Sequence, residues 1–194
     1  MAQLLVKIPK ERIGVLIGPN GKVKENIEKK VSVNLEIDSE TGDITVNLNK
    51  DVTDPSLLFK ARDAVLAIGR GFSPGRAYKL FEDEDCMLTI IDLREIFGRS
   101  QSDIKRIKGR IIGKEGRTRK IIEELTDATV SVYGHTISII GGLEEAETAR
   151  EAISMLIKGS QHATVYRYLQ RKRTELKKRR LELWEGRPLI PTDT

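Results

Sequence analysis

Two Gly-x-x-Gly tetrapeptides combine residue types and a spacing that suit the binding of phosphate. They are Gly18, Pro19, Asn20 and Gly21, and Gly113, Lys114, Glu115 and Gly116. Glycine has no side chain to hold a phosphate away from the main chain, and it permits unusual backbone angles. A helix that begins just after the second glycine would point its unpaired N–H groups and its positive dipole end at that phosphate. Each tetrapeptide therefore predicts an anion-binding loop.

The two tetrapeptides belong to two copies of one unit. RIGVLIGPNGKVKENI at 12–27 and KGRIIGKEGRTRKII at 108–122 superimpose at an offset of 95 residues. Downstream, VNLEI (33–37) matches ATVSV (128–132) and ITV (44–46) matches ISI (137–139), with the alternation typical of strands. ARDAV (61–65) then matches AREAI (149–153), inside segments whose apolar residues recur every three or four positions, as in helices. Each copy reads strand, short helix, Gly-x-x-Gly, helix, strand, strand, helix.

This order predicts an α+β fold with three strands per copy and helices on one face. LLVKI (4–8) and MLTIIDL (87–93) are the expected first strands. The predicted domains are 1–71, a connector at 72–86, a second domain at 87–160 and a basic C-terminal helix and tail at 161–194. We interpret the stretch 71–85, with Pro74, two glycines and an acidic run, as a connector and not as core. The segment from about His162 to Glu185 lacks Gly and Pro and predicts one helix, which Gly186 and Pro188 would end.

The net charge of +5 is unevenly placed along the chain. Residues 161–194 hold nine basic and four acidic side chains, so the rest of the chain is neutral overall. Charge also gathers at the tetrapeptides: residues 105–120 contain eight basic residues and one acid, and residues 7–30 contain seven and three. Positive charge attracts polyanions, most often nucleic acid. Because phosphate neutralisation supplies much of the affinity of such a site, the second loop is the predicted main site.

Composition argues against several other classes of protein. A single cysteine, Cys86, excludes an intrachain disulfide and a Cys-based metal site, and the cytoplasm is the expected location. The first residues are too interrupted by Lys7 and Pro9 for a signal or a membrane span. The acidic run Glu82 to Asp85 suggests a nuclease metal site only weakly, because contiguous carboxylates point in different directions. We predict no catalytic residue, no metal and no cofactor.

Taken with its flanking residues, the pattern resembles the type I KH domain, whose loop clamps the sugar-phosphate backbone of about four unpaired nucleotides. The resemblance implies two type I KH domains (β-α-α-β-β-α) in tandem plus a C-terminal helix, and single-stranded RNA as the ligand. Bases would lie on an aliphatic groove, and the adjacent strand would read their edges. That groove would be formed by Leu16, Ile17 and Ile27 in the first copy and by Ile111, Ile112 and Ile122 in the second.

The candidate RNA-binding residues surround the two loops. Around the first they are Ile17, Gly18, Pro19, Asn20, Gly21, Lys22 and Lys24, and around the second Arg110, Ile112, Gly113, Lys114, Glu115, Gly116, Arg117, Arg119 and Lys120. Lys24 and Arg119 stand where KH domains usually have an aliphatic residue. Glu115 would repel a phosphate unless its side chain points away, and both orientations remain open.

The basic tail offers a second candidate contact with RNA. Arg171, Lys172, Arg173 and Lys177 are the candidate contacts to the RNA backbone. The alternative is a solvated helix face, with Val165, Leu169 and Leu176 docking the helix on the second copy. Trp184 is interpreted as a packing residue.

Longer runs indicate a particular subfamily. The segments 109–142, 149–160, 165–173 and 70–85 together resemble the archaeal KH-domain ribosome-assembly factors of the Dim-two or partner-of-Nob-one family. This resemblance implies binding to the single-stranded 3′ end of 16S ribosomal RNA during maturation of the small subunit. The implied partners are a Nob-type endonuclease and a translation initiation factor, without a membrane or a small-molecule substrate. The alternative is a scaffold that recruits proteins in RNA processing or translation initiation, with RNA contact secondary.

Overall fold

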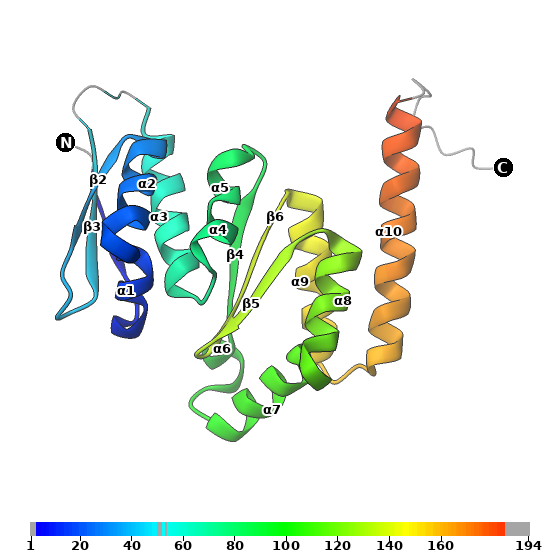
Figure 1. Cartoon of the computed structure of the whole chain (residues 1–194). Helices are drawn as coiled ribbons and strands as arrows, with labels where there is room; N and C mark the ends of the chain where they lie inside the picture. Colours follow the sequence, from blue (N-terminus) through cyan, green and yellow to red (C-terminus); the bar gives the residue numbers. More distant parts are fainter. Residues whose placement is uncertain (1–2, 50–51, 53, 185–194) are drawn as a thin grey trace.

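The computed structural model describes residues 3–49, 52 and 54–184, which form two α+β units and a long C-terminal helix. Figure 1 shows the units side by side, with the last helix, α10, along the outer side of the second unit. The predicted α+β fold with two tandem units is confirmed.

The first unit has an antiparallel sheet of order β1-β3-β2. Its helices lie on one face of that sheet, as the period-two strands require. Its elements are β1 (Gln3–Lys7), α1 (Lys10–Ile17), α2 (Lys22–Val31), β2 (Val33–Ile37), β3 (Asp43–Leu48) and α3 (Ser56–Gly69).

The second unit repeats this topology, with the sheet order β4-β6-β5. Its elements are β4 (Met87–Asp92), α6 (Leu93–Phe97), α7 (Gln101–Ile112), α8 (Arg117–Thr126), β5 (Thr129–Tyr133), β6 (Thr136–Gly141) and α9 (Leu143–Ile157). The short helix α6 was not expected from the sequence. It begins because the Asp92 carboxylate accepts a hydrogen bond from the backbone N–H of Arg94 at 2.8 Å, which ends the strand one residue earlier than predicted.

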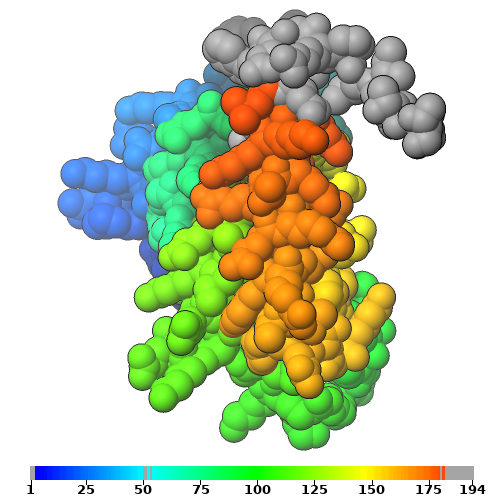
Figure 2. All heavy atoms as spheres, turned by 90° about the vertical axis from the view of Figure 1, so that its right-hand side faces the viewer, coloured from blue at the N-terminus to red at the C-terminus, as the bar shows by residue number. Residues whose placement is uncertain are grey.

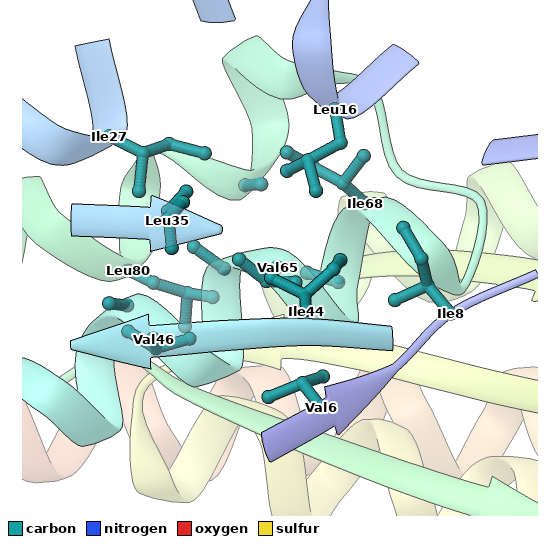
Figure 3. Close-up of a cluster of buried hydrophobic side chains, with 14 of the residues drawn as sticks. Val6, Ile8, Leu16, Ile27, Leu35, Ile44, Val46, Val65, Ile68 and Leu80 are labelled. Atoms are coloured by element: carbon teal, nitrogen blue, oxygen red, sulfur yellow. The ribbon is translucent and has the colours of Figure 1, made fainter. Parts of the chain in front are cut away.

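The core of each unit lies between its sheet and its helices. In the first unit Leu16 and Ile27 point toward Leu35 and Ile68 and are fully buried (Figure 3). Their counterparts Ile111 and Ile122 are buried in the second core. The expectation that these four side chains line a base-binding groove is therefore wrong, because their helical spacing points them at the sheet. Of the six predicted aliphatic residues, Ile17 and Ile112 remain half-buried at the helix ends.

The segment between the units is packed and helical, and the expectation that it stays out of the core is wrong. It forms α4 (Pro74–Ala77) and α5 (Lys79–Glu82). Phe72, Ala77 and Leu80 are buried in the first core. Burial of these three side chains fixes α4 and α5 against the first unit.

The second sheet is covered on both faces. Ile137 and Ile139 of β6 pack against the helices of their own unit, whereas Ile140 belongs to the first core. Because side chains alternate along a strand, Thr136 and Ser138 share the face of Ile140, and both are buried. The two units therefore share an interface built on this face of the sheet.

Hydrogen-bonding and charged contacts also join the units across that interface. The Ser131 hydroxyl donates to the carbonyl oxygen of Arg70 at 2.9 Å, and the Tyr133 hydroxyl donates to the Glu11 carboxylate. The Arg12 guanidinium lies 5.5 Å from the centre of the Tyr133 ring. Burial, and then the Glu11 carboxylate, raise the pKa of Tyr133, so its hydroxyl stays protonated and keeps donating.

The C-terminal helix α10 (His162–Trp184) is docked by its first half. Val165 and Leu169 are fully buried in the second core, and the Tyr168 hydroxyl donates to the Glu151 carboxylate of α9. Figure 2 shows the helix running along the outer face of the molecule. The predicted single helix is confirmed over these residues, whereas its expected end at Gly186 and Pro188 and the Trp184 side chain lie outside the described residues.

Candidate nucleic-acid interface

The two Gly-x-x-Gly loops have the same backbone conformation. Gly18 has φ 70° and ψ 178°, and Gly113 has φ 72° and ψ 178°, a region open essentially to glycine alone. Gly21 and Gly116, with φ 75° and 76°, are left-handed. Each pair of glycines encloses one 3-10 turn, Pro19–Gly21 or Lys114–Gly116, from which α2 or α8 begins. The loops are thus two copies of one structural device.

Close packing adds a second constraint at the first glycine of each loop. A Cβ atom on Gly18 would overlap the Val23 side chain, and one on Gly113 would overlap the Thr118 side chain. A Cβ atom on Gly21 or Gly116 would meet nothing within 4 Å. The second glycine therefore leaves room for a ligand, whereas the first holds the turn against its helix.

The residues inside the turns also adopt left-handed angles. Asn20 has φ 53° and Glu115 has φ 54°, a conformation that asparagine tolerates far better than glutamate. The exposed Glu115 side chain lines a shallow depression on the outer face of α8 together with Lys120 and Glu124. The lining of this depression also includes the cations Lys114 and Arg117.

Positive charge is arranged differently at the two loops. At the second loop Lys114, Arg117 and Lys120 are exposed. At the first loop Lys22 is exposed, but the Lys24 ammonium lies 3.7 Å from the Glu28 carboxylate on the next turn of the same helix. The structure thus places more exposed cations at the second loop.

A glutamate on the helix after each loop is hydrogen-bonded to the neighbouring edge strand. The Glu28 carboxylate accepts a hydrogen bond from the Leu35 backbone N–H at 2.8 Å, and the Glu123 carboxylate accepts one from the Val130 N–H at 2.8 Å. The two pairs are 95 residues apart, the offset of the loops. The edge strand was expected to read the edges of bases. The backbone N–H groups of Leu35 and Val130 are, however, already hydrogen-bonded within the protein. Val132, two residues after Val130, directs its backbone groups to the same edge.

Arg76, which belongs to the first unit, contacts the glutamate beside the second loop. Its guanidinium lies 3.1 Å from the Glu123 carboxylate of α8. Arg119 stands one turn before Glu123 on the same helix face. We call this region, with Arg119 and Glu123, the strand side of the second loop. Sequence reasoning missed Arg76 and Glu123, although a glutamate at the same offset in both copies was a usable signal.

A depression lies on the opposite, helix side of the second loop. It is bounded by α7, the loop, α8 and the beginning of α10, and is lined by Arg106, Gly109, Arg110, Gly113, Lys114, Arg117, Thr118, His162 and Tyr166. Arg110, Lys114 and Arg117 were predicted to bind RNA together with Ile112 and Arg119. The structure places Arg110, Lys114 and Arg117 at this depression, whereas Arg119 and Ile112 do not line it.

The predicted tail contacts lie farther along α10. The Glu175 carboxylate is 3.6 Å from the Arg171 guanidinium and 3.4 Å from the Lys172 ammonium, so part of their charge is balanced locally. Arg173 is half-buried and Lys177 is exposed. At a rise of 1.5 Å per residue, Lys177 is about 16 Å beyond Tyr166 along the helix. The structure does not gather these residues at the loop.

The remaining candidate features are metal ligands, a membrane span and the lone thiol. Among residues 3–49, 52 and 54–184 no three His, Cys, Asp or Glu side chains are grouped to hold a metal ion. In the same part of the chain no helix has the length and apolarity that crossing a membrane requires. The Cys86 thiol is half-buried, and burial followed by the Asp83 carboxylate raises its pKa, which favours the unreactive thiol form.

Together the two sheets, the helix order and the paired loops define a tandem KH-domain protein of type I. Comparison with known families agrees with this class. A model of the second KH domain of PNO1, described as a eukaryotic type KH-domain (KH-domain type I), matches residues 87–174. A model of the Krr1 KH1 domain matches residues 5–83. The chain belongs to the Dim2/PNO1 family of KH-domain proteins.

Individual relatives support this family membership. A KH domain-containing protein of Methanocaldococcus jannaschii is 49% identical over 93% of this chain and 78% of its own length. The pre-rRNA-processing protein PNO1 of Candida albicans is 28% identical over 90% of this chain, which spans 63% of that protein. A crystal structure of a complex of a/eIF2α, aDim2p and rRNA from Pyrococcus horikoshii contains a similar chain. That chain superimposes on this one with a TM-score of 0.84 and 49% sequence identity. The match covers 90% of this chain and 95% of that one.

Proposed function

We propose that this protein binds single-stranded ribosomal RNA at the 3′ end of 16S rRNA during maturation of the small ribosomal subunit. Its main contact is the second Gly-x-x-Gly loop, and it acts without catalysis of its own. The proposal rests mainly on the second loop. Gly116 has open space around it and lies among the exposed cations Lys114, Arg117 and Lys120. The rRNA in the complex of the Pyrococcus relative supports the choice of ligand.

In this proposal each group at the loop has its own role, which the loop geometry supports. A phosphate approaches Gly116, where a side chain is absent and space is open, and meets the N-terminal N–H groups of α8. Arg119 on the strand side contacts the same strand of RNA, and the backbone of Val132 reads a base edge. The first loop, with the same backbone, contributes a weaker contact because its neighbouring charge is partly paired.

A substitution at Gly116 tests this function. From sequence alone, Gly113→Asp with Gly116→Asp is expected to abolish RNA binding and preserve the fold. The structure corrects this design, because any side chain at Gly113 overlaps Thr118. Gly116→Asp alone places a negative charge in open space at a left-handed angle that Asp and Asn both tolerate.

Gly116→Asn is the matched control, since it has the same size and backbone demand without the charge. We expect Gly116→Asp to weaken binding to a 12-nucleotide RNA of the 16S 3′ end by about a hundredfold, and Gly116→Asn by much less, because the added charge repels phosphate. Fluorescence anisotropy measures both affinities, and circular dichroism checks the fold. Equal RNA affinity of a folded Gly116→Asp variant and the unmodified protein would contradict the proposal.

Protein partners form the second part of the proposal. The complex of the Pyrococcus relative contains a/eIF2α, which supports recruitment of that initiation factor, and family resemblance adds a Nob-type endonuclease. If recruitment is the main role and RNA contact is secondary, partner binding persists at salt concentrations that release RNA. Co-purification with a/eIF2α at about 0.1 and 1 M salt, with and without Gly116→Asp, separates the two roles.

A further inference from the structure

The depression on the helix side of the second loop is a cationic surface that a four-nucleotide site does not require. Arg106, Arg110, Lys114 and Arg117 line it, and its other lining groups are glycines, a threonine, a histidine and a tyrosine. The lining is basic, because its four charged side chains are all cations and it includes no carboxylate. It suits a flexible polyanion better than an apolar protein surface.

The first unit provides an internal comparison. At the offset of 95 residues, the positions of Arg106, Arg110, Lys114 and Arg117 are held by Glu11, Val15, Pro19 and Lys22. The loop backbones of the two units are nevertheless the same. The KH fold and its loop therefore form without these cations, and three of the four are particular to the second unit.

The wall of the depression is held in place by hydrogen bonds from α10 and the residues just before it. The Thr118 and Tyr166 hydroxyls are 3.0 Å apart, and the Arg110 guanidinium donates to the Ser160 carbonyl oxygen at 2.7 Å. His162 Nε2 lies 3.0 Å from the carbonyl oxygen of Arg110. Thr118 replaces the apolar Val23 of the first unit at the same position, and it is buried. A buried hydroxyl thus joins α10 to this site.

Two of the guanidinium groups are not fully hydrogen-bonded within the described residues. Arg110 Nε is buried and has no hydrogen-bond partner within the described residues. Arg106 is exposed, and its guanidinium lies 3.0 Å from the Asp103 carboxylate three residues earlier on the same helix. The Ser100 hydroxyl, and then Arg106, lower the pKa of Asp103. An exposed pair of this kind contributes little stability, so Arg106 can exchange Asp103 for a phosphate.

We propose that this depression is a second phosphate-backbone site, which holds the stretch of RNA flanking the four nucleotides bound at the loop. The RNA then passes around the Gly113 to Gly116 turn, with its bases on the strand side and its flanking phosphates on the helix side. This inference rests on the proposed function, since it requires that the loop binds RNA. It adds Arg106, His162 and Tyr166 to the proposed RNA-binding residues. It does not involve the predicted tail contacts farther along α10.

Charge reversal at Arg106 tests the site, because this side chain is exposed and lies outside the loop. Lys105→Glu is the matched control: it is the neighbouring residue on α7, is exposed, carries the same charge and does not line the depression. The probes are a 12-nucleotide RNA from the 3′ end of 16S rRNA and the four-nucleotide fragment of it whose binding Gly116→Asp abolishes. Affinities are measured by anisotropy over a range of salt concentrations.

Arg106→Glu is expected to weaken binding of the 12-nucleotide RNA about tenfold. The slope of log affinity against log salt concentration should become shallower by about 0.7 for each phosphate that the variant no longer neutralises. Binding of the tetranucleotide should change less than about twofold, and Lys105→Glu should change either affinity only to that extent. If Arg106→Glu lowers the melting temperature, Arg106→Gln replaces it, with Lys105→Gln as its control.

Three outcomes would overturn the inference. Equal effects of Arg106→Glu and Lys105→Glu on the 12-nucleotide RNA, with Gly116→Asp still weakening its binding about a hundredfold, would refute the flanking site and leave the proposed function intact. Equal reductions in affinity for both RNAs would place Arg106 in the loop site itself. Unchanged RNA affinity together with abolished a/eIF2α binding would make the depression a protein surface. If the unmodified protein binds neither RNA, the proposed function fails first.

Discussion

At the scale of single residues, the two glycines of each loop are constrained for different reasons. Gly113 combines angles that only glycine adopts readily with the close approach of Thr118. Gly116 has a left-handed φ of 76° and open space around it. The motif therefore contains one glycine that shapes the turn and one that leaves room for a phosphate.

Alanine at each position should separate these constraints. Gly113→Ala is expected to lower the free energy of unfolding by about 3 kcal/mol, because strain and overlap add. Gly116→Ala is expected to lower it by about 1 kcal/mol, the cost of a left-handed alanine. Urea denaturation of the two variants measures the difference. Equal destabilisation would show that Thr118 moves away without cost.

Some residue-scale features could be predicted from the sequence and others could not. The loop glycines and their surrounding cations were identifiable because type and spacing carry the information. The burial of Leu16 and Ile111 was not recognised, because an apolar residue next to a binding loop has the same pattern whether it faces a ligand or a sheet. Tertiary contacts such as that of Arg76 with Glu123 have no local sequence pattern.

At the scale of elements, the buried contacts of α10 with the second unit lie in its first half, and Arg179 of its second half lies 2.7 Å from the Glu144 carboxylate of α9. Tyr168 joins α10 to α9 through the Glu151 carboxylate. The pKa of Tyr168 is raised above its ordinary value of about 10. Burial is the main cause, followed by the hydrogen bond to Glu151 and the charge of its carboxylate. A tyrosine whose pKa is raised by folding adds stability below the unfolded pKa and loses it as the pH rises through the folded pKa.

Tyr168→Phe should therefore show a pH-dependent cost. At pH 8 we expect the variant to be less stable by about 1 kcal/mol, because water screens the bond to an exposed carboxylate. The difference should shrink as the pH rises above about 10, where the hydroxyl of the unfolded chain begins to ionise. Urea denaturation from pH 8 to 11 measures it, with Glu151→Gln as a comparison that keeps an acceptor and removes the charge. A difference that stays constant up to pH 11 would contradict this account.

The order of elements was predictable, and the exceptions have physical causes. Period-two and helical patterns repeated in two copies indicated each strand and helix of the repeat. Helix α6 was missed because five residues are too few to show a helical period. The segment 72–86 was misjudged because its Pro, Gly and acidic residues mark turns, whereas its buried Phe72, Ala77 and Leu80 are separated by polar residues.

At the scale of the whole molecule, the units meet across a face with four small polar residues. Thr129, Ser131, Thr136 and Ser138 are buried there. From sequence, threonine and serine alternating with isoleucine and valine indicate a strand with one solvated face, so the contact between the units could not be predicted. The interface joins the two loop-bearing units through buried contacts.

Ser138 offers a test of that interface. Its hydroxyl is fully buried and has no hydrogen-bond partner within the described residues. Ser138→Ala removes this unsatisfied group with little change in volume, so it should raise the free energy of unfolding by about 1 kcal/mol. Thermal melting and urea denaturation measure the change. A destabilised variant would indicate a bound water that bridges the hydroxyl to the first unit.

The carboxylates of Glu28 and Glu123 have a consequence beyond RNA. Each accepts the outward N–H of an edge strand, β2 or β5, that a strand from another copy would otherwise pair with. Sheet extension from one molecule to the next would have to break these bonds and bury a carboxylate. The duplicated glutamates therefore oppose the addition of a strand from another molecule at β2 and β5.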